Sequence, residues 1–304
     1  MCGVKETISD QAQKLWLQWV EAAFPKLDSR AYFLPPVYVN RVPMTRQSVA
    51  GQEILVLESE PKQAGENNHS PVQNSDIRDD EAFQRVFLYL QKKSEENNEV
   101  LVVLSQFRFG QYLSEPCYAA ATAQLPMAKN LPNSSSRDRQ GEFDMLVIHR
   151  LYGFVVCEVK ALGKNLKESK MTDLELQDNI RKKLRDAVSQ LDKAEAMLSH
   201  LVSDIAPGLR ITKTIAVPNL KTCQVQQAIS GDPKLLEDLC QCLRTNQVDI
   251  ICSEQLSESK TPQDVSNDME TNLGNWWQRH VAGAEPDSHM TDVVYRTLVA
   301  RRQQ

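Results

Sequence analysis

The sequence lacks the residue spacings that mark several common classes of protein. Its seven cysteines form no CxxC pair and its five histidines never fall four residues apart, so the sequence signals for zinc ribbons and helical zinc-protease sites are absent. It also has no GxGxxG, GxxxxGKS/T or GxSxG motif. No apolar run approaches the ~20 residues of a membrane span, and residues 1–10 lack the basic-then-apolar pattern of a signal peptide. We therefore expect an intracellular protein, cytoplasmic or nuclear.

The charge balance excludes a protein that coats nucleic acid through bulk charge. The chain has 304 residues, with 35 Lys and Arg against 40 Asp and Glu, which gives a net charge of -5. A local basic site remains compatible with this balance. Hydrophobic residues make up 41% and charged residues 25% of the chain, which are ordinary values for a globular protein.

Hydrophobic periodicity predicts alternating helices and strands in the middle of the chain. The expected helices cover residues 80–93, 173–202 and 233–243. The expected strands cover residues 100–104, 143–149, 154–161, 211–217 and 248–252. This order is typical of an α/β fold in which a central mixed β-sheet is flanked by helices.

The two ends of the chain follow different patterns from the middle. An amphipathic helix is expected over residues 9–24 and a short strand over 53–57, whereas residues 59–79 are polar and without apolar period. A further helix is expected near residues 264–280. These patterns predict four parts, which are an N-terminal helical extension, a flexible linker, an α/β domain and a C-terminal helical tail, at residues 1–58, 59–79, 80–258 and 259–304.

The stretch GEFDMLVIHRLYGFVVCEVKA, from Gly141 to Ala161, carries the chemistry. It predicts a β-hairpin, and side chains on a strand alternate between faces, so Glu158 and Lys160 share one face. The hairpin can bring Glu158 beside Asp144. Two carboxylates and a lysine then converge, and hard oxygen ligands of this kind suit Mg²⁺ or Mn²⁺.

A structural interpretation of the same residues stands beside this one. Glu-x-Lys at the polar end of a strand is common as an exposed cross-strand ion pair. However, Val155, Val156 and Cys157 make the strand almost wholly apolar, as in a buried central strand. Charges embedded there need partners or a metal, which favours a functional site.

The string GEFDMLVIHRLYGFVVCEVK resembles the core of the PD-(D/E)XK nuclease superfamily, and most closely its nuclease-related (NERD) branch. The family pattern has a GEfD strand, a turn with Gly and an apolar strand that ends in ExK. An acidic-headed helix at residues 80–93 and the segments AVSQLDKAEAML and ITKTIAVPNL match the family in order. The resemblance covers roughly residues 80–256 and implies a restriction-endonuclease-like core.

The resemblance assigns roles to residues of the hairpin. It implies that Asp144 and Glu158 are the metal-binding carboxylates, that the backbone carbonyl of Val159 is a further ligand, and that Lys160 is the catalytic lysine. We expect Glu142 to support the site or face solvent.

Two more positions follow from the same resemblance. The family's acidic residue on the first helix corresponds to Asp80 or Glu81: residue type favours Glu81, whereas helical phase with Phe83 and Phe87 favours Asp80. Either can instead be a charge that stabilises a helix start. Gln190 matches the family's glutamine on the following helix, although it can also be a boundary residue without a role.

A substrate surface is expected next to the hairpin. Basic residues follow the lysine strand at Lys164, Lys167, Lys170, Arg181, Lys182, Lys183 and Arg185. They can contact phosphates, although a solvated helix face is the commoner explanation for any one of them. Trp276 and Trp277 can stack on bases, but adjacent tryptophans in a helix more often belong to a core or an interface.

Together these features predict a metal-dependent nuclease that hydrolyses phosphodiester bonds of nucleic acid, DNA or RNA, with DNA as the expected substrate and Mg²⁺ or Mn²⁺ as cofactor. Related nuclease-like domains are often joined to helicases, so a helicase or another protein is an expected partner. The alternative is a catalytically inactive module that keeps the fold and recruits a nucleic-acid or protein partner.

Overall fold

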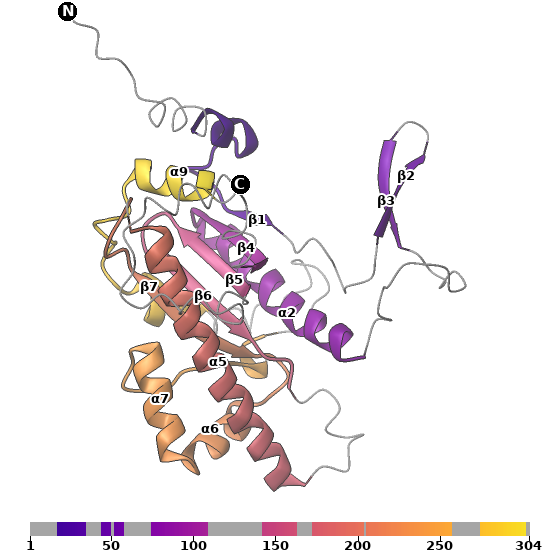
Figure 1. Ribbon diagram of the computed structural model, residues 1–304, viewed down its shortest axis with the longest axis vertical. Coiled ribbons are helices and arrows are strands. Elements are labelled where there is room, and N and C mark those ends of the chain that lie inside the picture. Colours follow the sequence, from indigo (N-terminus) through magenta and orange to yellow (C-terminus); the bar gives the residue numbers. More distant parts are fainter. Residues whose placement is uncertain are drawn as a thin grey trace, which may run out of the picture.

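A computed structural model of the chain describes most of its residues (Figure 1). The described residues are 17–34, 44–49, 52–57, 74–108, 142–162, 172–203, 205–256 and 274–301. The expected polar linker upstream of residue 74, part of the expected N-terminal helix, and most of the tail helix expected at 264–280 lie outside these ranges.

The fold is built on a mixed six-stranded sheet with the strand order β1-β4-β5-β6-β7-β8. Its strands are β1 (Tyr32–Leu34), β4 (Leu101–Arg108), β5 (Glu142–His149), β6 (Gly153–Val159), β7 (Ile211–Val217) and β8 (Ile251–Cys252). Strand β5 runs antiparallel to both its neighbours, β4 and β6, whereas the pairs β1 with β4, β6 with β7 and β7 with β8 are parallel. The predicted α/β fold with a central mixed sheet is therefore confirmed.

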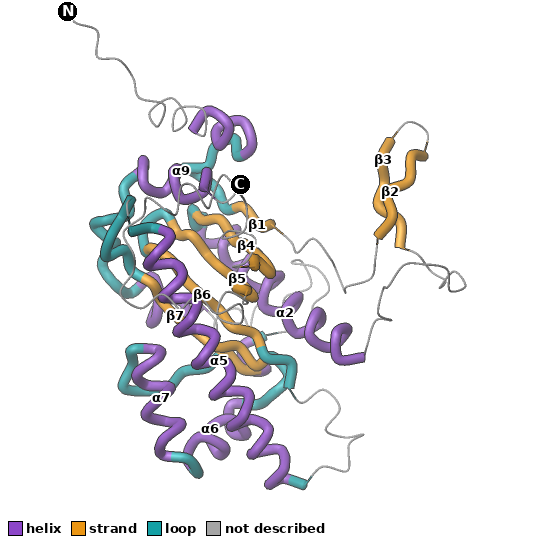
Figure 2. Tube along the Cα trace, in the orientation of Figure 1, coloured by secondary structure: helices purple, strands orange, loops and turns teal. Residues whose placement is uncertain are grey.

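Helices cover both faces of this sheet, as Figure 2 shows. Helix α5 (Asp173–Leu201) lies across one face with α6 (Thr222–Ser230) and α7 (Pro233–Leu243), and α2 (Asn74–Asn97) lies on the other. The strands are apolar on both sides, because Leu146 and Val156 pack toward α5 while Met145 and Cys157 pack toward α2. This burial on both faces explains why the sequences of β5 and β6 are nearly continuous hydrophobic runs.

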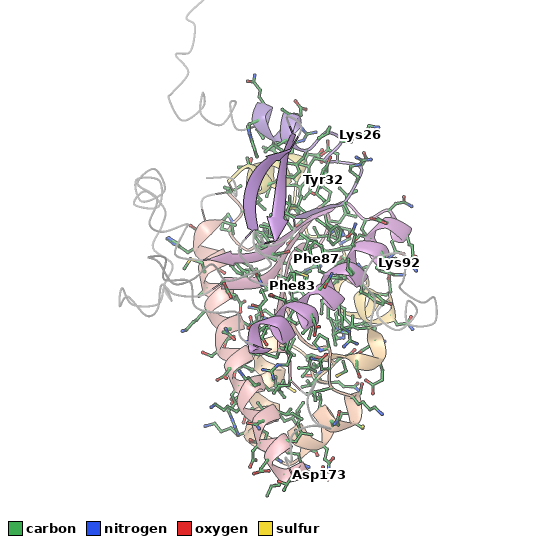
Figure 3. All side chains as sticks on the ribbon, turned by 90° about the vertical axis from the view of Figure 1, so that its right-hand side faces the viewer. Lys26, Tyr32, Phe83, Phe87, Lys92 and Asp173 are labelled. Carbon is green, nitrogen blue, oxygen red and sulfur yellow. The ribbon has the colours of Figure 1, made fainter. Side chains whose placement is uncertain are left out.

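Aromatic side chains hold α2 against the sheet. Phe83 and Phe87 lie on its sheet-facing side, whereas Lys92 lies further along the same helix (Figure 3). The ring of Phe87 meets Phe33 of β1 edge-to-face, with 5.4 Å between ring centroids. Such an arrangement aligns the positive ring edge with the negative ring face.

The β5–β6 hairpin is fixed by its turn. Gly153 has a φ of +84°, and a Cβ there would lie 2.4 Å from the carbonyl oxygen of Arg210, so both conformation and space require glycine. The buried His149 accepts hydrogen bonds at Nδ1 from the amides of Leu151 and Tyr152, at 3.0 and 3.3 Å. Its Nε2 lies 2.9 Å from Glu99 Oε2. His149 therefore stabilises the turn through these hydrogen bonds.

Local sequence signals position the helices on the α5 face. Helix α5 begins after Thr172, whose hydroxyl accepts the amide of Glu175 while Glu175 accepts the amide of Thr172, a reciprocal capping box. Helix α7 begins after Asp232, with Pro233 in its first turn. Both helices begin at the residues that these capping signals predict.

Several elements differ from the sequence expectations. Helix α2 begins at Asn74 rather than Asp80, so residues 74–79, expected in the linker, are helical; their polarity hides the helical period. Strand β1 belongs to the main sheet although it falls in the expected extension. Beside the expected strand 53–57, found as β3 (Gln52–Leu57), β2 (Met44–Val49) completes a separate two-stranded sheet.

Differences also occur toward the C-terminus. Helix α6 was not expected, and β8 is shorter than the expected strand over residues 248–252. A 3₁₀ turn, η2 (Ser253–Gln255), directly follows β8. Within the described part of the tail, residues 274–277 are helical, η4 (Gln278–Ala282) is a π-helix and α9 (Asp292–Arg301) follows. Tyr295 and Val299 of α9 join the core on the α5 side.

Candidate active site

The candidate site lies where β5 and β6 separate. The pairing of these strands runs from His149 and Gly153 to Met145 and Cys157 and stops there. At the next position the backbone N–H of Val159 donates instead to the side chain of Asp144, at 2.8 Å from Oδ2. The Asp144 carboxyl thus takes the place of a backbone acceptor and is held at the point of separation.

Glu158 is the most deeply buried acid of the site, with 2% of its surface exposed. It lies on the α5 face of β6, in line with Phe154 and Val156. Its carboxyl group hydrogen-bonds that of Asp144. Burial raises the pKa of Glu158 well above its usual range, and the charge of Asp144 raises it further, whereas Lys160 opposes the shift.

The pKa of Asp144 moves in the same direction. Burial raises it, while the Lys160 charge and the Val159 amide act to lower it. If both carboxyl groups ionised, their negative charges would repel each other at short distance. The pair therefore retains a proton that isolated carboxyl groups would release. The proton thus belongs to the pair of carboxyl groups.

Lys160 connects the acids to α5. Its Nζ lies 2.5 Å from Glu158 Oε1 and 2.5 Å from Gln190 Oε1, so the ammonium donates to both. Its backbone amide donates to the Ala216 carbonyl at 2.8 Å, which fixes the residue just beyond the end of β6. Gln190 is exposed on α5, next to the buried Leu191. Four residues named from the sequence, Asp144, Glu158, Lys160 and Gln190, are therefore brought together.

The acids of α2 do not join this group. Asp80 is buried, with 7% of its surface exposed, whereas Glu81 is only partly buried, which agrees with the helical phase of Phe83. However, the part of the chain that the structure describes contains no cluster of three His, Cys, Asp or Glu side chains suited to a metal ion. Neither Asp80 nor Glu81 thus completes a three-ligand set with the hairpin acids.

The site accordingly offers two carboxyl groups as metal ligands. Mg²⁺ often binds through only one or two carboxylates and keeps several waters, so this donor set fits such an ion. The observation that supports the fit is the contact between two acids with raised pKa values, because a divalent cation would relieve the repulsion between them. The Val159 amide is engaged with Asp144, and its carbonyl remains an expected ligand.

The basic residues on α5 separate into two kinds. Arg181 contacts Asp178 and donates to the Ala228 carbonyl, and Arg185 pairs with Asp232, so both are engaged within the fold. Lys182 and Lys183 are exposed. Residues 164, 167 and 170 lie outside the described ranges, so the expected basic surface is described only in part.

The tryptophan pair belongs to the core. Trp276 and Trp277 are 2% and 4% exposed and pack on the α2 side of the sheet. The indole N–H of Trp276 donates to the Asp249 carbonyl at 3.2 Å. Their burial favours the packing interpretation over base stacking.

One ionic cluster near the site was not expected. Lys213 of β7 is 8% exposed, and its Nζ lies 2.9 Å from Asp192 Oδ1 and 2.6 Å from Glu195 Oε2 of α5. The sequence does contain a signal for it. Alternation along the β7 segment ITKTIAV places Lys213 on the same face as the buried Ile211 and Ile215, which predicts a buried lysine.

Comparison with known proteins yielded no match to a protein-family model, to a curated protein or to a solved structure. Among the helices that the structure describes, none combines the length and hydrophobicity of a membrane span.

Proposed function

We propose that the protein is a divalent-metal-dependent nuclease that hydrolyses phosphodiester bonds of nucleic acid, with DNA as the first substrate to test. One observation carries the proposal: the buried Glu158 and the partly buried Asp144, whose carboxyl groups interact, meet a lysine and a glutamine at the separated ends of adjacent strands. Structural ion pairs rarely bury two carboxyl groups against one ammonium, because the excess acid is costly. Such an arrangement favours a function in which a bound metal cation neutralises the excess acid.

In this proposal Asp144 and Glu158 hold Mg²⁺ or Mn²⁺ through their carboxylate oxygens. When bound, the ion supplies charge neutralisation at the phosphate and a water of lowered pKa. The Val159 amide keeps Asp144 oriented, since it donates to Oδ2 and leaves the other oxygen available. Binding then requires the acid pair to release its shared proton.

Lys160 and Gln190 act on the substrate side. The ammonium of Lys160 is held between Glu158 and Gln190, so it is fixed beside the acids without being buried completely. From there it donates hydrogen bonds to an attacking water and to a phosphate oxygen, which stabilises the negative charge of the transition state. Gln190 uses its carbonyl oxygen for Lys160, and its amide NH₂ is left to contact substrate.

The second candidate is a catalytically inactive module that binds a nucleic acid or a protein. The observation that favours it is the absence, among the residues with described positions, of a third acidic ligand beside Asp144 and Glu158. In this case Lys160 neutralises the acid pair permanently, and the site has a structural role.

The deciding experiment is cleavage of labelled single- and double-stranded DNA and RNA, with Mg²⁺ or Mn²⁺ and with chelator. The parent is compared with Glu158→Gln, which keeps the shape of the side chain but removes its charge. Glu237→Gln is the matched control, since Glu237 is an exposed glutamate on α7. The proposal expects metal-dependent cleavage by the parent and the control, and loss of at least about 100-fold in Glu158→Gln.

The same variants separate the two candidates. Cleavage that persists in Glu158→Gln assigns the activity to another site or to a contaminant. If the parent neither cleaves any of the four substrates nor binds Mg²⁺ or Mn²⁺ in calorimetry, the nuclease proposal fails and the inactive module is favoured.

A further inference from the structure

A cavity of about 410 Å³ lies along the edge of β7, apart from the acid pair. Strand β8 pairs only with Ala216 and Val217, so on the edge of β7 opposite β6 the described residues place no strand beside its first part. The space is closed instead by the end of α7, by Asp249 and by the segment that contains η4. We call it the β7-edge cavity.

The cavity is separate from the candidate active site. None of Asp144, Glu158, Lys160 and Gln190 lines it. Glu158 lies on the α5 face of the sheet, and Thr214 alternates to the opposite face, beside Trp276. A ligand in the cavity would therefore not contact the acid pair.

The charge of the lining favours an anion. Four basic side chains, Arg210, Lys213, Arg244 and Arg279, belong to the lining. Three of them are paired with acids: Lys213 contacts Asp192 and Glu195, Arg244 contacts Glu195, and Arg279 contacts Asp249. Hydrogen bonds from His280 and Arg279 lower the pKa of Asp249, so the charge of this acid is balanced by its own partners. Arg210 forms no ion pair with the described residues, so its guanidinium is the cation that remains for an anion.

Two polar groups in the wall lack partners. The buried Nη1 of Arg210 and the buried Oγ1 of Thr214 have no hydrogen-bond partner in the described structure. Thr214 is only 3% exposed. A buried polar group without a partner is costly, so both positions favour a ligand that supplies hydrogen-bond acceptors. The guanidinium N–H can only donate, and the threonine hydroxyl can donate as well.

The spacing of these groups defines the shape of the ligand. Arg210 and Thr214 are four residues apart on an extended strand, which separates their Cα atoms by about 13 Å. An elongated ligand, with an anionic group at one end and an acceptor at the other, matches this separation.

We propose that the β7-edge cavity binds a small phosphate monoester of about mononucleotide size, with its phosphate against Arg210 and its far end accepting a hydrogen bond from Thr214. The guanidinium fork of Arg210 matches phosphate geometry, and it attracts a dianionic phosphate more strongly than a single carboxylate. The volume is within the range of small-ligand sites.

The test is calorimetric titration of the full chain with AMP, ribose 5-phosphate, inorganic phosphate, adenosine and citrate. Chelator is present throughout, so that a phosphate held by a metal ion at Glu158 does not contribute. The expected result is saturable binding of AMP or ribose 5-phosphate, weaker binding of inorganic phosphate and none of adenosine.

Variants assign the binding to the cavity. Arg210→Gln is expected to weaken phosphate-ester binding at least about 10-fold, and Thr214→Val to weaken it several-fold without changing the affinity for inorganic phosphate. Lys234→Gln removes an exposed charge on α7 and is the matched control, with no expected effect. If Arg210→Gln does not fold, Arg210→Lys keeps the charge but loses the fork and is expected to weaken binding as well.

Three outcomes overturn the proposal. They are no saturable binding of either phosphate ester, binding that is unchanged in both cavity variants, and citrate binding tighter than both esters. Binding that persists in Glu158→Gln and disappears in Arg210→Gln supports the cavity whether or not the chain has nuclease activity.

Discussion

The amide of Val159 donates a hydrogen bond to Asp144 across the point where β5 and β6 stop pairing. A carboxyl oxygen here does what a strand carbonyl does elsewhere in the ladder. The two strands can therefore separate without leaving this amide unsatisfied, and the separation creates room for the carboxyl groups of Asp144 and Glu158 to meet. The site is thus a consequence of how the hairpin ends.

The metal-free protein is expected to lose stability as pH rises above the ordinary carboxyl pKa of about 4. Burial raises the pKa values of Glu158 and Asp144, so above the ordinary carboxyl pKa the folded protein holds a proton that the unfolded chain has released. The folded state binds more protons in this window, and stability therefore falls with rising pH until the folded pKa is passed. Glu158→Gln removes this linkage.

Melting temperatures in chelator check this expectation. The melting temperature of Glu158→Gln relative to the parent should rise steadily over the pH window, and Mg²⁺ should restore the parent at the high end. Parallel curves for the two proteins would show that the acids ionise freely and do not share a proton.

Metal binding is expected to release a proton. The acid pair retains a proton in the metal-free protein, and a divalent cation bound by both carboxylates displaces it. Calorimetry of Mn²⁺ binding at neutral pH, in two buffers that differ in ionisation enthalpy, should give about one proton per ion. An enthalpy of binding that is the same in both buffers contradicts the shared proton.

The fold of the central domain could be predicted because its elements carry strong local signals. The β5–β6 hairpin and α5 have long runs of clear period with a turn or cap at the end, and the structure contains them. Strand β1 has three residues, and the two residues of β8 pair only because β7 lies beside them. Such short strands depend on tertiary contacts, which local period does not encode.

The candidate site could be predicted in part for the same reason. Glu158 and Lys160 share a face by alternation alone, and the hairpin returns Asp144 beside them. Gln190 came only from the family resemblance, since its contact with Lys160 spans thirty residues of sequence. The β7-edge cavity was not foreseen, because its wall is assembled from four separate segments.

Gly153→Ala is expected to destabilise the protein by about 2–4 kcal/mol. The substitution adds a Cβ that would lie 2.4 Å from the Arg210 carbonyl, an oxygen that accepts the Phe154 amide at 2.9 Å. Gly208→Ala is the control, because Gly208 also has a positive φ of +91° but its Cβ would meet nothing closer than 3.7 Å. Urea unfolding should show a loss of only about 1 kcal/mol for the control; equal losses would mean that backbone conformation alone requires Gly153.

Lys160→Ala and Asp144→Asn are expected to separate catalysis from metal binding. Lys160→Ala removes the ammonium that contacts Glu158 and Gln190, so most cleavage should disappear while much of the metal affinity remains. Asp144→Asn keeps an oxygen for the Val159 amide but loses the charge, so metal binding and cleavage should both be lost. Because that change also relieves repulsion with Glu158, the metal-free Asp144→Asn protein should melt no lower than the parent. A purely structural ion pair predicts the reverse, with melting temperatures lowered in both variants and any cleavage unchanged. Melting temperature, Mn²⁺ affinity and cleavage, measured on the parent and on both variants, therefore distinguish an active site from a structural ion pair.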